Sequence, residues 1–328
     1  PAYFAYRDAL TPLMANIRAD RTAFFAGEPM RFDFWVCNDT HDLPKDAQLR
    51  YQLEVGGKIV FAQQTRAQVK PCDSAFQGFL KLRAPVVPTR TTGTLRLALT
   101  RRNGAVIHDT ALDVELFPAP ETTAPLEAVV IGDAAIARQL GVRAVKSANL
   151  YVVTDARRYA ARRRAIEAAV ERGATVVFLE LPEGEHQIGG TPIKVERCGM
   201  ESRHFVSRAT GHPLVADFQP DDFRFWFDPA KDRPAPLLER LFIAPGWAPV
   251  LSTGNGGWGV AWQPALAAAE LKRGAGCYRI CQVRLADLQK TNPVAKLFAS
   301  RLLNRLPVSC AGNVSATVEV QPGEKFRA

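Results

Sequence analysis

The sequence predicts a β-sandwich followed by a doubly wound α/β domain. Three observations support this prediction. Residues 14–118 alternate apolar and polar side chains with the period of a strand, and turns rich in Gly and Asn interrupt them. Residues 119–125 lie in the stretch PAPETTAP, whose Pro and Thr content predicts a linker. Residues 126–309 then alternate continuous apolar strands with helices, which is typical of a parallel sheet covered on both faces.

The elements of the sandwich follow from short alternating segments. MRFDFWVCND places its apolar side chains on one face, and QLRYQLEV and GTLRLALT repeat the pattern. Gly56 with Gly57, and Asn103 with Gly104, each predict a tight hairpin turn. About seven short strands in about 100 residues, without a helix signal, predict an immunoglobulin-like sandwich of two sheets.

The six cysteines do not supply a covalent framework for this sandwich. Cys37 and Cys72 are poorly placed for the disulfide of an immunoglobulin domain, so the sandwich is expected to rest on packing alone. Cys277 and Cys281 point to the same face of one predicted strand, roughly 13 Å apart at ~3.3 Å per residue, which is too far for a disulfide. We interpret most of the cysteines as buried thiols. The compartment stays open, with a periplasmic or secreted location slightly favoured over a cytoplasmic one.

The strands of the α/β domain are continuous apolar runs. AVVI, LYVV and TVVFLEL are predicted strands buried on both faces, and the helices between them end at Gly141 and Gly173. The region 185–256, rich in Pro, His and Trp, is expected to be irregular and to lead into strands around a turn at 274–276. A closing helix begins with Asn292 as its N-cap. This order predicts a flavodoxin-like sheet, the type also found in class I amidotransferases.

The chain carries 42 Lys and Arg against 33 Asp and Glu, a formal net charge of +9. Most of these basic residues are scattered, but several arginines gather on one predicted helix in DARRYAARRRAIEAAVERG. We interpret this cluster as a solvated face, because no aromatic platform or nucleic-acid-binding motif accompanies it; nucleic acid is therefore not expected as a partner. No apolar run approaches the ~18 residues of a membrane span, so no membrane partner is expected either.

The residues offer no complete active site, and no cofactor or metal is predicted. Cys198, followed by His204 and His212, is the nearest candidate for a nucleophile of amidotransferase type, although no clear apolar strand leads into it. GNGGWG formally matches a dinucleotide fingerprint, yet it runs into a strand instead of a helix. The five His share no metal-ligand spacing. At the carboxyl ends of the predicted parallel strands, where such sheets bind ligands, the chain offers Asp133, Thr154 and a Leu-Pro pair but no nucleophile.

Three tryptophans fall in or beside the irregular region: Trp226, Trp247 and Trp258. Trp rings stack on sugars through their apolar faces, so Trp247 and Trp258 are the candidates for substrate contact. The alternative interpretation is that these rings belong to the core.

The order of segments resembles the C-terminal region of family 2 glycoside hydrolases of the β-galactosidase type. PAYFAYRDAL resembles the end of the last helix of the catalytic (β/α)8 barrel, so residues 1–13 are interpreted as its remnant. FFAGEPMRFDFWVCNDT resembles the opening strands of the sandwich that follows the barrel. GHPLVADFQPDDFRFW, ELKRGAGCYRICQVRL and NPVAKLFASRLLN resemble the appended amidotransferase-like domain, which is called the trimerisation domain in related galactosidases. Residues 310–328 are expected to form a last strand and a tail.

This resemblance implies a non-catalytic accessory region that acts in domain packing, oligomerisation or shaping of a substrate cleft. Both catalytic residues of the family are glutamates on barrel strands, so neither is carried over to any position here. The implied partners are an N-terminal catalytic barrel, a carbohydrate substrate of the whole enzyme and further copies of the chain. Two alternatives stay open: a free-standing amidotransferase-like hydrolase with Cys198 as nucleophile, and an interaction module whose basic helix binds an acidic partner.

Overall fold

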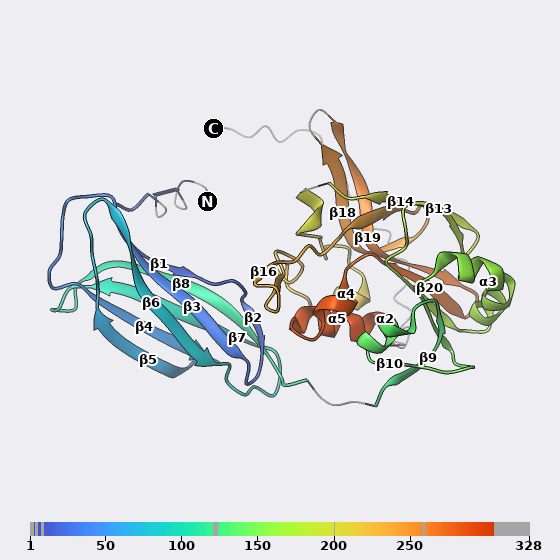
Figure 1. Ribbon diagram of the computed structural model, residues 1–328, viewed down its shortest axis with the longest axis horizontal. Coiled ribbons are helices and arrows are strands. Elements are labelled where there is room, and N and C mark those ends of the chain that lie inside the picture. Colours follow the sequence, from blue (N-terminus) through green and yellow to red (C-terminus); the bar gives the residue numbers. More distant parts are fainter. Residues whose placement is uncertain are drawn as a thin grey trace.

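The computed structural model describes residues 3, 6, 7, 10–120, 124–199, 201–257 and 260–304 (Figure 1). Two bodies lie side by side along the long axis of the molecule. We call residues 11–118 the sandwich and residues 126–304 the α/β lobe.

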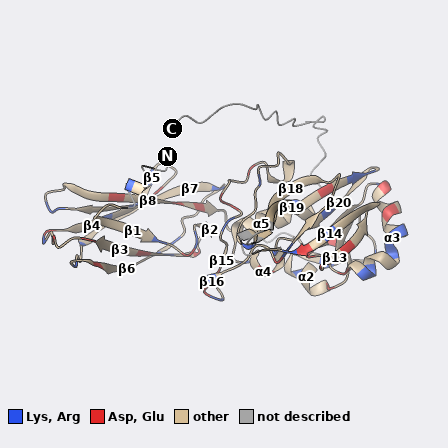
Figure 2. Ribbon diagram, turned by 90° about the horizontal axis from the view of Figure 1, so that it is seen from above, with Lys and Arg blue, Asp and Glu red and all other residues tan. Residues whose placement is uncertain are grey.

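The sandwich consists of two sheets that lie face to face (Figure 2). The three-stranded sheet has the order β1 (Leu13–Arg18), β3 (Pro29–Asn38), β6 (Asp73–Arg83). The five-stranded sheet has the order β2 (Ala23–Phe25), β8 (Val106–Phe117), β7 (Thr91–Thr100), β4 (Gln48–Val55), β5 (Lys58–Arg66). Neighbouring strands are antiparallel, except that β2 runs parallel to the end of β8.

The predicted alternation of apolar side chains is confirmed in the sandwich. Phe32, Leu95 and Leu97 are completely buried between the two sheets. Gly56 and Gly57 form the hairpin turn between β4 and β5, and both adopt the left-handed backbone that such a turn requires. Because Cys37 and Cys72 are both free thiols, this pair of sheets is held by apolar packing and not by a bridge between them.

The α/β lobe is built on one mixed sheet. Its parallel part has the order β10 (Val142–Ala144), β9 (Leu126–Ile131), β11 (Leu150–Val153), β12 (Thr175–Leu179), β20 (Gly276–Cys281). In chain order this reads 2-1-3-4-5, the order of flavodoxin-like sheets. Antiparallel strands extend it through β19 (Val260–Arg273), β17 (Arg240–Ile243), β14 (Thr191–Arg197) and β13 (Gly184–Ile188), and β18 (Ala248–Gly257) pairs with β19.

Helices cover both faces of the parallel strands. Helix α3 (Ala156–Glu171) packs on one face through Tyr159, Ile166 and Val170. The other face is covered by α2 (Ala134–Gln139), α4 (Leu285–Leu288) and α5 (Pro293–Leu303). Asn292 caps α5 as predicted, since its side chain accepts hydrogen bonds from the first turn of the helix. The predicted alternation of buried strands and helices is therefore confirmed for this part of the lobe.

The expectation that residues 185–256 are irregular is wrong in part. Four longer strands, β13, β14, β17 and β18, lie in this region, with the short pair β15 (Phe227–Asp228) and β16 (Arg233–Pro234) and the 3-10 turns η1 (Glu201–Arg203) and η2 (Pro213–Val215). Pro and Gly interrupt the local pattern, and these strands are fixed by partners far away in the chain. Of the predicted first helix, only residues 3, 6 and 7 are described as helical, and the predicted strand and tail at 310–328 lie outside the described residues.

A buried charge network joins the sheet of the lobe to the end of α5. Glu270 of β19 lies opposite Arg279 of β20, and the Arg279 Nε atom donates to the Glu270 carboxylate at 2.8 Å. Arg279 also donates to the carbonyl oxygens of Leu302 and Asn304. Burial alone would raise the pKa of Glu270, but His212 and Arg279 outweigh it and hold this pKa down at about 2.

We expect Glu270→Gln to destabilise the lobe by about 3 kcal/mol at neutral pH, because Arg279 is then left buried without its carboxylate. The low pKa means that the stabilisation by Glu270 is present above pH 4.5 and is lost as the pH falls towards 2. Urea unfolding at several pH values measures this gap between wild type and variant. Glu185→Gln, on an exposed strand position, is the matched control, and a gap that does not narrow in acid would contradict the assignment.

Candidate functional site

The two predicted tryptophans that the structure describes, Trp226 and Trp247, are buried and form no sugar-binding surface. Trp247 is only 5% exposed, and its Nε1 atom donates to the Thr191 hydroxyl at 2.7 Å. Trp226 is buried as well and donates to the Asp222 carbonyl oxygen. Both rings are therefore core side chains that offer no open face to a sugar. Trp258 lies outside the described residues.

A different tryptophan lies at the surface of the lobe. Trp262 of β19 is 54% exposed. Its indole ring lies across Gly254 and Gly256 of the neighbouring β18, so closely that a Cβ atom on Gly254 would collide with it. Gly254 and Gly256 thus belong to a strand that pairs with β19, and the ring that covers them accounts for these two glycines without a pyrophosphate at a helix. The sequence analysis did not identify the exposed ring of Trp262, although the glycines that it covers were a signal for a close contact.

Cys198 follows strand β14 directly, so a strand does lead into it, contrary to expectation. The thiol is 7% exposed and donates to the Leu238 carbonyl oxygen at 3.3 Å. Burial raises its pKa to about 11. His204 stacks on Phe225, and His212 lies beside Glu270 instead of beside the thiol. This environment is that of a structural thiol, since a nucleophilic cysteine needs a lowered pKa and a base.

The crevice where a sheet of this order usually binds its ligand lies between the carboxyl ends of β9 and β11. In this chain the segments that follow β9 and β11 contact each other and close the crevice. The Asp133 backbone N–H donates to the Thr154 hydroxyl at 2.6 Å, and Gly132 approaches Thr154 so closely that a Cβ atom would collide with it. Asp133 and Asp155 direct their carboxylates to the first turns of α2 and α3. The polar residues that the sequence placed at this edge therefore cap and close it.

Glu180, at the carboxyl end of β12, is the residue that sequence reasoning missed. It adopts a left-handed backbone with φ 50°, which is uncommon for a residue with a side chain and recurs at functional sites. Burial raises the pKa of its carboxyl group; Arg284 acts against this rise, and Asp287 adds to it. The available signal was a carboxylate immediately after a fully buried strand.

Charged side chains from three other segments surround this position. Glu239 accepts two hydrogen bonds of 3.0 Å from Arg203 and one of 3.4 Å from Arg284, and Arg284 also pairs with Asp287. A small polar pocket of about 60 Å³ lies beside them, lined by Arg284 and Asp287 among others. That volume holds about two water molecules. The charged side chains at this edge are thus paired with one another.

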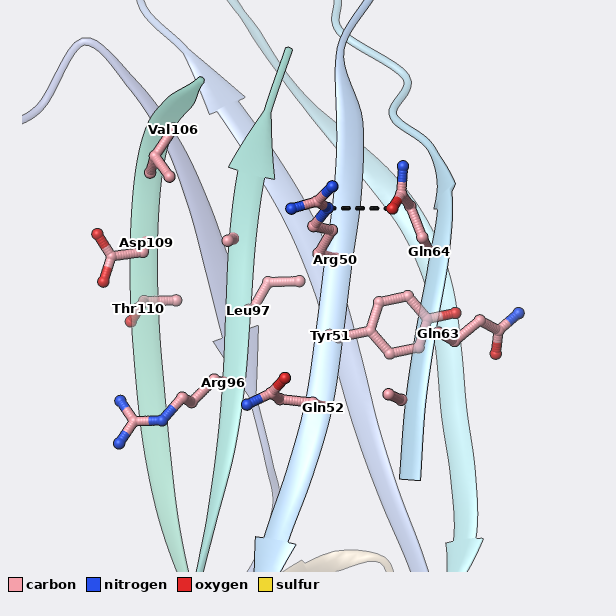
Figure 3. A pocket seen from close by; sticks show the side chains of 12 residues that line it. Arg50, Tyr51, Gln52, Gln63, Gln64, Arg96, Leu97, Val106, Asp109 and Thr110 are labelled. Carbon is pink, nitrogen blue, oxygen red and sulfur yellow. Dashed lines mark hydrogen bonds between the residues drawn. The ribbon is translucent and has the colours of Figure 1, made fainter. Parts of the chain in front are cut away.

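A hollow lies on the outer face of the five-stranded sheet (Figure 3) and has a volume of about 700 Å³. Its polar lining side chains come from four neighbouring strands: Arg50 and Gln52 from β4, Gln64 from β5, Arg96 from β7, Asp109 and Thr110 from β8. Apolar residues, among them Ala62 and Val106, line the rest. Arg50 donates to Gln64 at 3.0 Å. Tyr51 also lines the hollow, but its ring packs against Phe34 inside the sandwich. The hollow therefore has hydrogen-bonding groups and no aromatic ring turned towards it among the described residues.

The part of the chain that the structure describes contains no group of three or more side chains that could hold a metal ion. Its helices are also too short or too polar to cross a lipid bilayer.

Comparison with known proteins does not place the chain in a family. No family model matches the sequence, and no curated protein matches it. Solved structures match in part: the CARDB domain of a Pyrococcus furiosus protein has 9% identity over 32% of this chain and 93% of that domain, with a TM-score of 0.26. A Bacteroides fragilis protein assigned as a β-galactosidase has 12% identity over 52% of this chain, with a TM-score of 0.26. A β-glucuronidase from Parabacteroides merdae has 11% identity over 52% of this chain, with a TM-score of 0.23.

Structural neighbours therefore include glycosidase chains and immunoglobulin-like modules. The chain spans only 25% and 24% of the length of the two glycosidases. At these TM-scores the likeness carries no argument about activity. The amidotransferase-like assignment of the lobe finds no support among these matches.

We expect the thiols to differ in reactivity as their burial predicts. Cys72 is exposed, whereas Cys198 is buried with a raised pKa. Iodoacetamide at pH 8 should therefore alkylate Cys198 at least about 100-fold more slowly than Cys72, because only the thiolate reacts. Peptide mass spectrometry at timed intervals measures both rates. Rapid labelling of Cys198 in the folded chain would contradict a structural role.

Glu180→Gln should stabilise the lobe at alkaline pH. A raised pKa means that folding favours the protonated carboxyl group, so the contribution of Glu180 to stability is most favourable in acid and falls as the pH rises through the folded pKa. At pH 8 we expect the variant to melt above wild type, and each ~1 kcal/mol of stabilisation corresponds to roughly 2–4 °C in a domain of this size. At pH 4 the two melting temperatures should converge. If the variant melts lower at pH 8, the arginines near Glu180 outweigh its burial.

Proposed function

We propose that this chain is a non-catalytic accessory region of a glycoside hydrolase, in which the sandwich and the α/β lobe act as one rigid support. The observation that carries the proposal is the junction between the two bodies. The sequence resemblance to the C-terminal region of family 2 glycoside hydrolases supports the same role.

The junction is centred on Arg90, in the sandwich segment just before β7. Its two terminal nitrogens donate to the Asp222 carboxylate of the lobe at 2.7 and 2.8 Å. Its Nε atom donates to Glu115 of the sandwich at 2.7 Å. The guanidinium group also lies 4.9 Å above the Phe117 ring. One side chain therefore makes a two-pronged contact with the lobe while it is held in place from the sandwich side.

Apolar and polar contacts continue the junction on either side of Arg90. Phe25 and Phe117, at the ends of β2 and β8, belong to the same buried cluster as the core of the lobe beneath α5. Arg21 donates to the Thr291 carbonyl oxygen at 2.9 Å, and the Lys296 ammonium group lies 6.0 Å from the Phe25 ring. A shared core and directed hydrogen bonds restrain both the distance and the orientation of the two bodies. Such restraint suits a spacer or buttress in a larger enzyme.

The proposal includes the partners that the resemblance implies. A catalytic (β/α)8 barrel would supply the two catalytic glutamates, and a carbohydrate would be the substrate of the whole enzyme. Association between copies of this region is a further part of the same proposal. The alternative, an amidotransferase-like hydrolase with Cys198 as nucleophile, is not favoured, because the thiol is buried and bonded to a backbone carbonyl group.

An activity assay tests the accessory role directly. We expect residues 1–328 to hydrolyse none of a panel of aryl glycosides above a buffer blank. The polypeptide encoded upstream of Pro1 should show a (β/α)8 pattern with two glutamates at strand ends. Turnover by residues 1–328 would overturn the proposal, and turnover that Cys198→Ala abolishes would favour the alternative.

We expect Arg90→Ala to uncouple the two bodies, because it leaves the buried Asp222 carboxylate without its cationic partner, a loss of about 3–5 kcal/mol. Proteinase K should then cut the stretch 118–125 faster and leave two resistant fragments. The control is Arg101→Ala, which removes an exposed ion pair with Asp46 inside the sandwich. Equal cleavage rates in wild type and Arg90→Ala would contradict a junction that depends on Arg90.

A further inference from the structure

The outer face of the three-stranded sheet carries exposed aromatic rings. Phe76 and Phe79 of β6 are 39% and 49% exposed, and the half-buried Trp35 lies beside them on β3. The ring centroids of Trp35 and Phe76 are 5.0 Å apart, and those of Phe76 and Phe79 are 4.9 Å apart. We call these three residues the aromatic platform. A contiguous group of large exposed apolar rings is informative, because isolated apolar residues are common at surfaces but patches mark binding sites.

A β-bulge builds this platform. Residues three apart on a regular strand point to opposite faces, so Phe76 and Phe79 should not share one. The register between β3 and β6 shifts between Phe34 and Trp35, and Gly78 adopts φ +113° at this point. The extra residue, Gln77, is anchored: its amide nitrogen donates to the carbonyl oxygens of Gln68 and Ala75, and its amide oxygen accepts from the Gln68 backbone. Bulges of this kind re-aim side chains, and this one brings both rings to the solvent side.

Cationic side chains surround the platform. The Arg31 guanidinium group lies 4.6 Å from the Phe79 ring centroid, and the Lys81 ammonium group lies 5.8 Å from it. Arg18 pairs in register with Asp33, which in turn lies opposite Phe79. The Arg31 Nε atom lies 3.6 Å from the Asp33 carboxylate, and Arg18 lies 3.8 Å from the Asp20 carboxylate, so Lys81 and the terminal nitrogens of Arg31 carry the charge that is left to a ligand. Within the described residues, the terminal nitrogens of Arg31 and the Lys81 ammonium group have no hydrogen-bond acceptor.

We propose that the aromatic platform binds an acidic oligosaccharide, with the rings beneath sugar faces and with Arg31 and Lys81 paired to its carboxylates. Aromatic rings contribute stacking and cations contribute charge complementarity, so together they select a ligand that has apolar faces and negative groups. This site adds to the accessory role and does not depend on it, since it lies on the sandwich alone.

The rings of the platform are tilted relative to one another. Trp35 and Phe76 are inclined by 49°, and Phe76 and Phe79 by 66°. Consecutive sugar rings can turn about their glycosidic bonds, and so they can follow a surface whose rings are tilted.

Isothermal titration calorimetry with short oligogalacturonides tests the proposal on residues 1–328. We expect binding by wild type that weakens with salt, and at least about tenfold weaker binding by Phe76→Ala/Phe79→Ala. Arg31→Gln/Lys81→Gln should lower the affinity to a similar degree and flatten its salt dependence. Phe79→Leu keeps an apolar side chain without a ring and should also weaken binding. This single variant provides the test if the double variant Phe76→Ala/Phe79→Ala folds poorly.

The hollow of the five-stranded sheet provides the matched control. Arg50→Gln/Arg96→Gln removes the same number of positive charges on the opposite face and should leave binding unchanged. Neutral cello-oligosaccharides of equal length should bind more weakly than the oligogalacturonides. The proposal is overturned by absence of binding, by equal binding of the ring variants, or by equal binding of the neutral sugar. Tighter binding of oligo(dT) that depends on the same rings would identify a nucleic-acid surface instead.

Discussion

One guanidinium group, that of Arg90, is the contact on which the arrangement of the two bodies depends. Its partner Asp222 is itself fixed in the lobe: this carboxylate accepts from the Gln219 backbone, and the Asp222 carbonyl oxygen accepts from the Trp226 ring nitrogen. The long segment between β14 and β17 is therefore organised around the same residue that meets the sandwich. Because Arg90 also covers Phe117, the ion pair and the apolar part of the junction form together. A rigid unit of two folds follows from this combination.

The lobe uses the edge of its parallel sheet in an unusual way. Sheets of this order usually keep the carboxyl ends of their strands open for a ligand. Here Thr154 closes against Gly132, and ion pairs of Glu239 and Arg284 fill the space near Glu180. The strained backbone of Glu180 persists because the surrounding structure holds it. The polar groups of the lobe thus stabilise its own connections, which agrees with a supporting role.

Local patterns predicted the elements of this chain better than the surfaces that those elements present. The strand alternation around Leu95 and the cap of Asn292 depend on neighbours in sequence, and both are confirmed. The strands within 185–256 pair with distant segments, so local irregularity concealed them. Trp247 could be placed in the core or at the surface by its sequence context, and only packing decides between the two. Phe76 and Phe79 are three residues apart and share one face only because a single extra residue shifts the register, a feature without a local sequence pattern.

The separation of Arg90 and Asp222 along the chain has a consequence for folding kinetics. These residues are 132 positions apart, so their contact closes a very long loop. Contacts of such separation form late, after the sandwich and the lobe have each built their own sheets. Stabilisation that is absent from the transition state for folding slows unfolding and leaves the folding rate almost unchanged. The junction therefore affects the rate at which the two bodies separate more than the rate at which they assemble.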